Sequence, residues 1–436
     1  MQDETVIDPR TISPERRGFL PAWNYPQYRL LWISALGTYI GRWIETIVGA
    51  WLVLELTNSP FLVGLLGTCR FAAMLLGPFC GTISDRFNRR RILILAQIVY
   101  AAAAFIIMIL FLTSQLDVWH LFAFTLIGGL CFTFDFSTRF ATAANIVKSG
   151  HLVNAVSLLL VAMGTTSILG PLLGGTLLEV IGGSGCFALV TASFVLSLIA
   201  LLPMKIMAPI RPKNHESMWR NFVDGLRYIR NDNVLFPLIL IAALVNLFVF
   251  PYWFTLMPIF ARDILHTEVS GFGQLMAAIG LGAIIGALIT GTLPNYVNKG
   301  KLIIIATIVW PATLIIFSIS HLFSLSLALL VIAGIAQGLA MALIQALLLI
   351  RSSEEMRGRV SGARAFAISA LPLGNLLAGA GASLWGAPTV LIINSSISII
   401  ITIFIAIWVA ASSPFLKAIT PLSEELSSNS HKVKHL

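Results

Sequence analysis

The sequence predicts an all-α membrane protein with about twelve transmembrane helices. Its 436 residues are 57% hydrophobic and only 11% charged, and the mean hydropathy is +0.90. Soluble globular domains carry about 25% charged residues. Apolar runs of about 20 residues, long enough to cross a bilayer as a helix, recur along the chain with charged segments between them. The composition therefore excludes an ordinary soluble domain.

We expect these runs to form two bundles of six helices each. The first six spans are Leu30–Leu54, Phe61–Ile83, Ile92–Thr113, Val118–Phe140, Leu152–Leu178 and Phe187–Met207. The second six are Val234–Phe260, Gly271–Leu293, Leu302–Ser320, Phe323–Ile350, Val360–Leu384 and Pro388–Ala411. The domain prediction follows: a cytoplasmic lead-in (1–29), a first bundle (30–207), a central cytoplasmic loop (208–233), a second bundle (234–411) and a disordered tail (412–436).

The basic residues orient this topology. With both termini in the cytoplasm, 25 of the 28 lysines and arginines fall in cytoplasmic segments or at the cytoplasmic ends of spans, as the positive-inside rule requires. The net charge of +9 is therefore explained by orientation and by attraction to lipid head groups, and we expect no nucleic-acid partner. Within the central loop, Phe222, Val223, Leu226 and Ile229 share one helical face and basic residues occupy the other, which predicts an amphipathic helix along the membrane surface.

The sequence lacks the residues that several classes of function require. The four cysteines lie in or beside apolar runs and have neither metal-site spacing nor an obvious disulfide framework, so we interpret them as packing residues. We find no nucleophile–base pattern and no phosphate-binding Gly-x-x-x-x-Gly-Lys-Ser/Thr loop. We therefore expect a protein that is not an enzyme, without metal or cofactor and without ATP-driven pumping.

A short arginine-rich loop follows the second span and carries a recognisable pattern. Its defining residues are Gly81, Asp85, Arg86, Arg89 and Arg90. Gly-x-x-x-Asp-Arg-x-x-Arg-Arg in this place resembles the signature loop of the major facilitator superfamily of secondary transporters. The resemblance covers roughly residues 20–412 and implies two pseudo-symmetric six-helix halves.

Internal similarity agrees with such a duplication. Gly81, Asp85 and Arg89 correspond to Gly291, Asn295 and Lys299 at a constant offset, and repeated halves are common in transporters. The resemblance implies that this loop latches the two halves through charge pairs, with Arg364 a candidate partner of Asp85. Replacement of Asp85 by Asn should cut transport and leave expression intact.

The fifth span contains Gly170, Pro171, Gly174 and Gly175. Proline bends a membrane helix and small residues permit close helix packing, so one interpretation is a packing kink. The string Gly-Pro-x-x-Gly-Gly also resembles a motif of family members that exchange substrate against ions, which are mainly exporters. This resemblance favours export over uptake.

Charged residues inside spans are costly and are therefore functional candidates. Arg42 and Glu45 lie three residues apart in the first span, and Arg70 lies in the second. An arginine–glutamate pair that only locks two helices is one interpretation. The other is a carboxylate that binds a proton during transport. The excess of arginine in this group suits an anionic or zwitterionic substrate.

The fourth span adds Asp135 and Arg139, four residues apart. They are either a simple ion pair along one helix or part of a gating or proton-linked site. Phe134-Asp135-x-x-x-Arg139, together with the stretches at 51–59 and 354–361, resembles the enterobactin-exporter-like and macrolide-efflux-like branch of the superfamily.

In the family fold, spans one, four, seven and ten line the substrate cavity. The resemblance thereby makes cavity candidates of five polar or aromatic residues in spans seven and ten. These residues are Asn246, Phe250, Trp253, Phe254 and Gln337. Aromatic rings with a few amides suit a hydrophobic, polyfunctional ligand, although for each ring alone a packing role is the simpler interpretation.

The resulting expectation is proton-coupled efflux of a drug-like or siderophore-like small molecule by alternating access. The alternatives are a lipid or lysolipid flippase, or an uptake permease, on the same fold; a sensor without transport would have no use for buried charges. We expect a monomer in the bacterial cytoplasmic membrane, with protons as coupling ion and the lipid bilayer as its surroundings.

Overall fold

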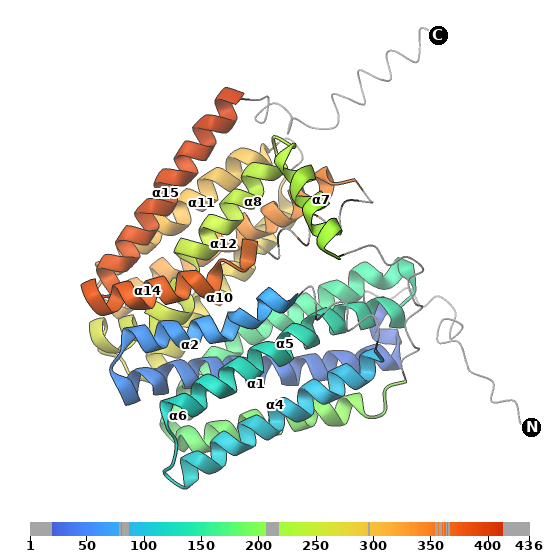
Figure 1. Cartoon of the computed structure of the whole chain (residues 1–436), viewed down its shortest axis with the longest axis vertical. Coiled ribbons are helices and arrows are strands. Elements are labelled where there is room, and N and C mark those ends of the chain that lie inside the picture. The colour runs from blue at the N-terminus through green and yellow to red at the C-terminus, as the bar shows by residue number, and fades with distance from the viewer. Residues whose placement is uncertain are drawn as a thin grey trace, which may run out of the picture. The chain divides into compact units, whose positions relative to one another are not determined.

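The computed structural model describes residues 20–77, 80, 87–205, 218–294, 297–353, 356, 360, 362, 364 and 367–412. Within these ranges the chain is almost entirely helical and contains no strand (Figure 1). Eight of the described helical segments are long and apolar enough to cross a membrane. The all-α membrane architecture expected from the composition is therefore confirmed.

The first half begins with a short 3-10 turn, Pro21–Asn24, and continues with α1 (Pro26–Thr57), α2 (Pro60–Ala72), a 3-10 turn (Ala73–Leu76), α4 (Arg89–Leu112), α5 (Val118–Ile146), a 3-10 turn (Ser149–His151) and α6 (Leu152–Leu201). Local sequence sets several ends. Pro26 occupies the first turn of α1, where its missing N–H costs nothing. Asp117 caps α5 through a capping box with His120.

The fifth and sixth predicted spans are two helical stretches of α6 that follow each other directly, with a sharp kink and no loop between them. The helix is interrupted only at Gly182, which adopts φ 68° and ψ 179°. A residue with a side chain is strained in that conformation, so glycine makes the sharp break possible. The loop expected between these two spans is therefore replaced by a break at one residue, Gly182.

The second half contains α7 (Met218–Arg230), α8 (Leu235–Leu244), α9 (Met257–Ile259), α10 (Val269–Thr292), α11 (Lys299–Ser318), α12 (Phe323–Arg351), α14 (Leu371–Trp385) and α15 (Ala387–Ser412). Helix α7 occupies the predicted amphipathic segment. Its Ile229 is buried, whereas Leu226, on the same predicted apolar face, is exposed.

The seventh span is irregular. Three π-helical segments, Val245–Val249, Tyr252–Leu256 and Phe260–Ile264, alternate with α-helix along residues 235–264. Pro251 and Pro258 lie between successive π segments. Since proline cannot donate the regular helical hydrogen bond, these positions explain where the winding changes. Such π-helical turns often mark functional sites.

The chain folds into two compact units. Of the described residues, one unit contains those within 20–58, 69–205 and 267–274, and the other contains those within 59–68, 218–266 and 275–412. Within the first unit, α1 and α4 pack against α6, and α5 packs against α4 (Figure 1). Within the second, α11 packs against both α12 and α15. The domain boundaries inferred from the sequence remain a prediction.

Candidate functional site

The most buried ion pair of the first unit joins Asp135 and Arg139 on α5. Arg139 donates from Nε to Asp135 Oδ2 at 2.9 Å and from Nη2 to Oδ1 at 2.6 Å. The two residues are 1% and 0% exposed. A bidentate guanidinium–carboxylate contact of this kind is strong and geometrically defined. The sequence predicted this i,i+4 pair, and the structure places it inside the helix bundle.

This pair is the centre of a polar network that reaches α1. Arg139 Nη1 donates to Leu31 O at 3.0 Å and to Ser34 Oγ at 3.2 Å, and Nη2 donates to Thr38 Oγ1 at 3.3 Å. The charge of Arg139 is therefore shared between its own helix and α1. A change in the charge of Asp135 would alter how firmly these two helices are held together.

The network continues to α4 and α6. Gln97 of α4 donates from Nε2 to Asp135 Oδ1 at 3.0 Å, and Thr38 Oγ1 donates to Gln97 Oε1 at 3.2 Å. Ser197 of α6 lies 2.9 Å from Thr38 and 2.7 Å from Ser34, hydroxyl to hydroxyl. Four helices thus share one polar network, in which Asp135 bonds directly to groups of α4 and α5. Burial in an apolar interior is tolerated because these polar groups satisfy one another.

A second buried pair joins α1 and α2. Arg70 Nη1 donates to Glu45 Oε2 and Arg70 Nη2 donates to Glu45 Oε1, each at 2.8 Å. Tyr100 donates to Glu45 Oε2 at 3.1 Å, and Arg70 also donates to Thr46 Oγ1 at 2.8 Å. Glu45 therefore pairs with Arg70 across helices and not with Arg42, its neighbour in the sequence.

Arg42 occupies a different environment. Its Nη1 donates to Gly128 O at 2.8 Å, and its guanidinium carbon lies 4.1 Å from the ring centroid of Phe132. Among the residues with described positions, no carboxylate forms an ion pair with it. Arg42 is half-buried, whereas Arg70 and Arg139 are buried.

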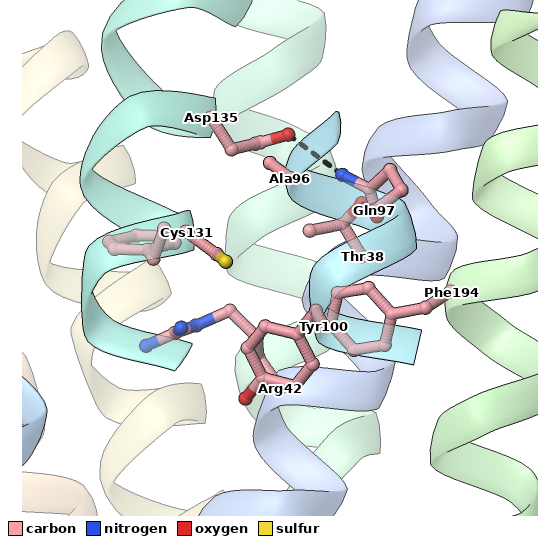
Figure 2. A pocket seen from close by; sticks show the side chains of 9 residues that line it. Thr38, Arg42, Ala96, Gln97, Tyr100, Cys131, Asp135 and Phe194 are labelled. Carbon is pink, nitrogen blue, oxygen red and sulfur yellow. Dashed lines mark hydrogen bonds between the residues drawn. The ribbon is translucent and has the colours of Figure 1, made fainter. Parts of the chain in front are cut away.

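A small cavity lies between the two ion-paired clusters. It is lined by Thr38, Arg42, Ala96, Gln97, Tyr100, Cys131, Phe132, Asp135 and Phe194. Figure 2 shows Gln97 and Asp135 at one end, Arg42 and Tyr100 at the other, and Cys131 between them. The space suits about one water molecule. Asp135 therefore borders this small cavity, whereas Glu45 is not part of its lining.

The predicted kink motif lies in α6 at close contacts with two other helices. A side chain on Gly170 would collide with Trp43 of α1, and one on Gly174 would crowd Ile44. Gly175 lies against the start of α10, where an added Cβ would be 2.6 Å from Val269 O. Pro171 lies inside the helix without breaking it. These positions require small residues for packing.

The signature loop is described only in part. Gly81, Asp85 and Arg86 lie outside the described residues, so the predicted latch stays a prediction. Arg89 donates to Ala141 O at 3.0 Å, near the end of α5. Arg90 donates to Leu201 O at 3.3 Å and also to Leu202 O, at the end of α6. Basic side chains commonly satisfy terminal helix carbonyls in this way.

In the second unit, three of the predicted cavity residues are buried and two of these meet. Trp253 Nε1 donates to Gln337 Oε1 at 3.1 Å and to Tyr252 Oη at 2.8 Å. Asn246 instead donates to Ala242 O within its own helix, at 2.7 Å. Phe250 and Phe254 are half-buried, and Phe250 packs edge-to-face on Trp310 with ring centroids 5.1 Å apart.

Sequence reasoning missed the groups that connect the charged pairs. Thr38, Gln97 and Tyr100 bridge the helices, yet none is charged and none stands in a recognised motif. Gln97 was the easiest of the three to recognise from the sequence, because an amide inside the apolar run 92–113 needs a hydrogen-bond partner. In the second unit, Tyr252 and Trp310 were missed because aromatic residues are common in membrane helices.

Comparison with known proteins decides the family. The family model MFS_3, which describes transmembrane secretion effectors, matches residues 19–428. The chain belongs to this family. It is accordingly a multi-pass membrane transporter of the major facilitator superfamily that carries small molecules, and the expectation that it is not an enzyme is confirmed by the family.

Curated relatives include exporters. The enterobactin exporter EntS of Citrobacter koseri is 24% identical over 343 residues, which cover 78% of this chain and 81% of the relative. The multidrug efflux pump Tap of Mycolicibacterium fortuitum is 24% identical over 362 residues, covering 80% and 88%. Similarity to this branch of the superfamily, expected from the motifs, is confirmed.

Solved transporters share the fold. A bacterial homologue of the human lysosomal transporter Spinster matches with a TM-score of 0.67 at 17% identity, covering 93% of this chain and 99% of the other. A POT family transporter matches with a TM-score of 0.70 at 10% identity, covering 88% and 96%. At these identities the likeness shows the fold alone, and it confirms the predicted twelve-helix major facilitator architecture.

Proposed function

We propose that this transporter is a proton-coupled exporter of siderophore-like or drug-like small molecules that works by alternating access. The curated exporters support the direction of transport and the substrate class. Supporting the coupling is the position of Asp135, a buried carboxylate that belongs to a polar network shared by four helices and borders a small cavity. The transporter is a monomer in the bacterial cytoplasmic membrane, with both termini in the cytoplasm.

The chemistry of Asp135 suits this role. As a carboxylate, it accepts two hydrogen bonds from Arg139 and one from Gln97. A proton on one oxygen removes the negative charge and converts that oxygen into a donor. The guanidinium of Arg139 then depends more on Leu31, Ser34 and Thr38 of α1 for its hydrogen bonds. Protonation thereby changes the balance of contacts between α5 and α1.

Glu45 is the second candidate carboxylate. It is bound by Arg70 and Tyr100, but it does not line the cavity. A group that exchanges protons with water needs a route to it, so we assign proton binding to Asp135. Glu45 and Arg70 lock α1 to α2. Arg42 contributes a positive charge beside the cavity.

A transport assay in proteoliposomes tests the function. Vesicles containing the purified full chain are given a pH gradient and a panel of siderophores, macrolides and lysolipids. Accumulation of a siderophore or macrolide that depends on the gradient is expected. Movement of lysolipid alone, or equal uptake after the gradient is collapsed with an ionophore, would contradict the proposal.

The control for general damage to the protein is a variant that changes a charge away from the buried network. Arg227 lies on α7 with a 73% exposed side chain. Arg227→Gln should transport as the wild type does, whereas Asp135→Asn should lose gradient-driven accumulation. Loss of transport in both variants would point to general damage and would contradict the assignment of Asp135.

A further inference from the structure

Among the residues that the structure describes, the intramembrane charges of the first unit do not balance. Three arginines, Arg42, Arg70 and Arg139, face two carboxylates, and each carboxylate is already held by two nitrogens of one arginine. Of the five N–H groups that a guanidinium carries, Arg42 uses one, toward the Gly128 carbonyl. Its guanidinium carbon lies over the ring of Phe132.

An unpaired cation inside a membrane protein is costly. Contacts with a carbonyl and an aromatic ring offset part of this cost, but neither cancels a full charge. Intramembrane arginines usually pair with carboxylates or face a ligand pathway. We propose that Arg42 binds an anionic oxygen group, such as a carboxylate, of the transported molecule. This inference rests on the proposed function and names the substrate class as acidic.

The surroundings of Arg42 fit the charged end of such a molecule. The cavity beside it holds about one water molecule, so it accepts one small polar group and not a whole substrate. Gln97 and Tyr100 line this space, and Phe132 and Phe194 supply apolar surface. Asp135 also lines it, but its charge is already compensated by Arg139.

The accessibility of Arg42 separates it from the two paired arginines. Arg70 and Arg139 are 5% and 0% exposed, whereas Arg42 is half-buried. A ligand can therefore reach Arg42 without breaking an ion pair. A neutral analogue of the ligand would leave the cation uncompensated, so the site should discriminate strongly between acid and amide.

Binding of a matched acid and amide tests the inference. The probes are benzoate and benzamide, which have nearly the same shape and differ in charge. Thermal unfolding of the purified full chain in nanodiscs is followed at fixed ionic strength while each probe is titrated. Wild type should bind benzoate about 10-fold more tightly than benzamide, as expected for a charge-assisted hydrogen bond.

Variants assign the preference to Arg42. Arg42→Gln should reduce the ratio of the two affinities to about one, because it keeps an amide donor and removes the charge. Arg42→Lys should keep part of the preference, since it keeps the charge and loses the planar fork. Arg227→Gln, at the exposed site on α7, should behave as wild type. The comparison of benzoate with benzamide on the wild type remains valid even where a variant does not fold.

Several outcomes would overturn the inference. These are equal affinity of wild type for the two probes, no shift with either probe, and an unchanged preference in Arg42→Gln. A third titration, with chloride, tests whether Arg42 binds an inorganic anion in place of the substrate. If chloride stabilises wild type through Arg42 and benzoate adds no more, the site holds an inorganic ion and the assignment to substrate is wrong.

The transport assay distinguishes failure of this inference from failure of the proposed function. If no compound of the panel is transported but benzoate preference depends on Arg42, the anion site stands and the exporter proposal fails. If a compound is exported but wild type does not prefer benzoate, the exporter proposal stands and the anion site fails.

Discussion

Arg70 of α2 holds both carboxylate oxygens of Glu45 on α1, with each nitrogen–oxygen distance 2.8 Å. The residues are 25 positions apart in the chain and are 5% and 1% exposed. The contact is thus a tertiary one, made inside the helix bundle. Its first consequence is for stability and not for transport.

Breaking this pair from one side should be more damaging than removing it completely. Arg70→Met leaves Glu45 buried without its counter-charge, which costs about 3–5 kcal/mol in comparable cases. In the double variant Glu45→Gln with Arg70→Met, neither position of the pair carries a charge, and at least half of the lost stability should return. Unfolding in mixed micelles with increasing SDS measures the free energies. A double variant as unstable as the single one would contradict the lock.

The glycine of the kink motif should matter through packing. In Gly170→Ala the added methyl group meets the Trp43 side chain on α1, and overpacking of this kind costs about 1–3 kcal/mol. Gly150 is the matched control, because a Cβ there meets no atom within 4 Å. The same SDS titration should show destabilisation of Gly170→Ala only. Equal stability of the two variants would show that the contact with α1 is adaptable.

The Trp253–Gln337 hydrogen bond should affect substrate handling. Trp253→Phe keeps an aromatic ring and removes the indole N–H that reaches Gln337 and Tyr252. Loss of a neutral hydrogen bond is worth about 1 kcal/mol, so KM for export should rise about fivefold with little change in the maximal rate. Trp385→Phe, at a 62% exposed tryptophan on α14, is the control. A KM unchanged by Trp253→Phe would remove this residue from the cavity.

Much of the fold was predictable because membrane helices are long and apolar. The spans follow from hydropathy, and the arginine-rich loop from its charges. Gly182 was not predictable as a break, since it is one of many glycines and its positive φ depends on how the two parts of α6 pack. The π-helical segments near Pro251 and Pro258 likewise follow from a local choice of hydrogen bonds that composition does not encode.

The candidate site was predictable as a set of charges but not as a set of pairs. Spacing suggested Arg42 as a neighbour of Glu45, yet Glu45 pairs with Arg70, because a cross-helix contact can engage both carboxylate oxygens. Gln97 and Thr38 joined the network only when α1, α4 and α5 were placed side by side. Helix contacts of this kind depend on tertiary packing, which periodicity in one sequence does not determine.

The central claim is that Asp135 carries the proton, and substrate exchange without a gradient tests it most directly. Asp135→Asn imitates a permanently neutral carboxyl group. In proteoliposomes loaded with a compound that wild type exports, the variant should still exchange internal for external compound, because that step needs no proton transfer. It should fail to accumulate the compound when a pH gradient is imposed. Gradient-driven accumulation by Asp135→Asn at the wild-type rate would contradict the account.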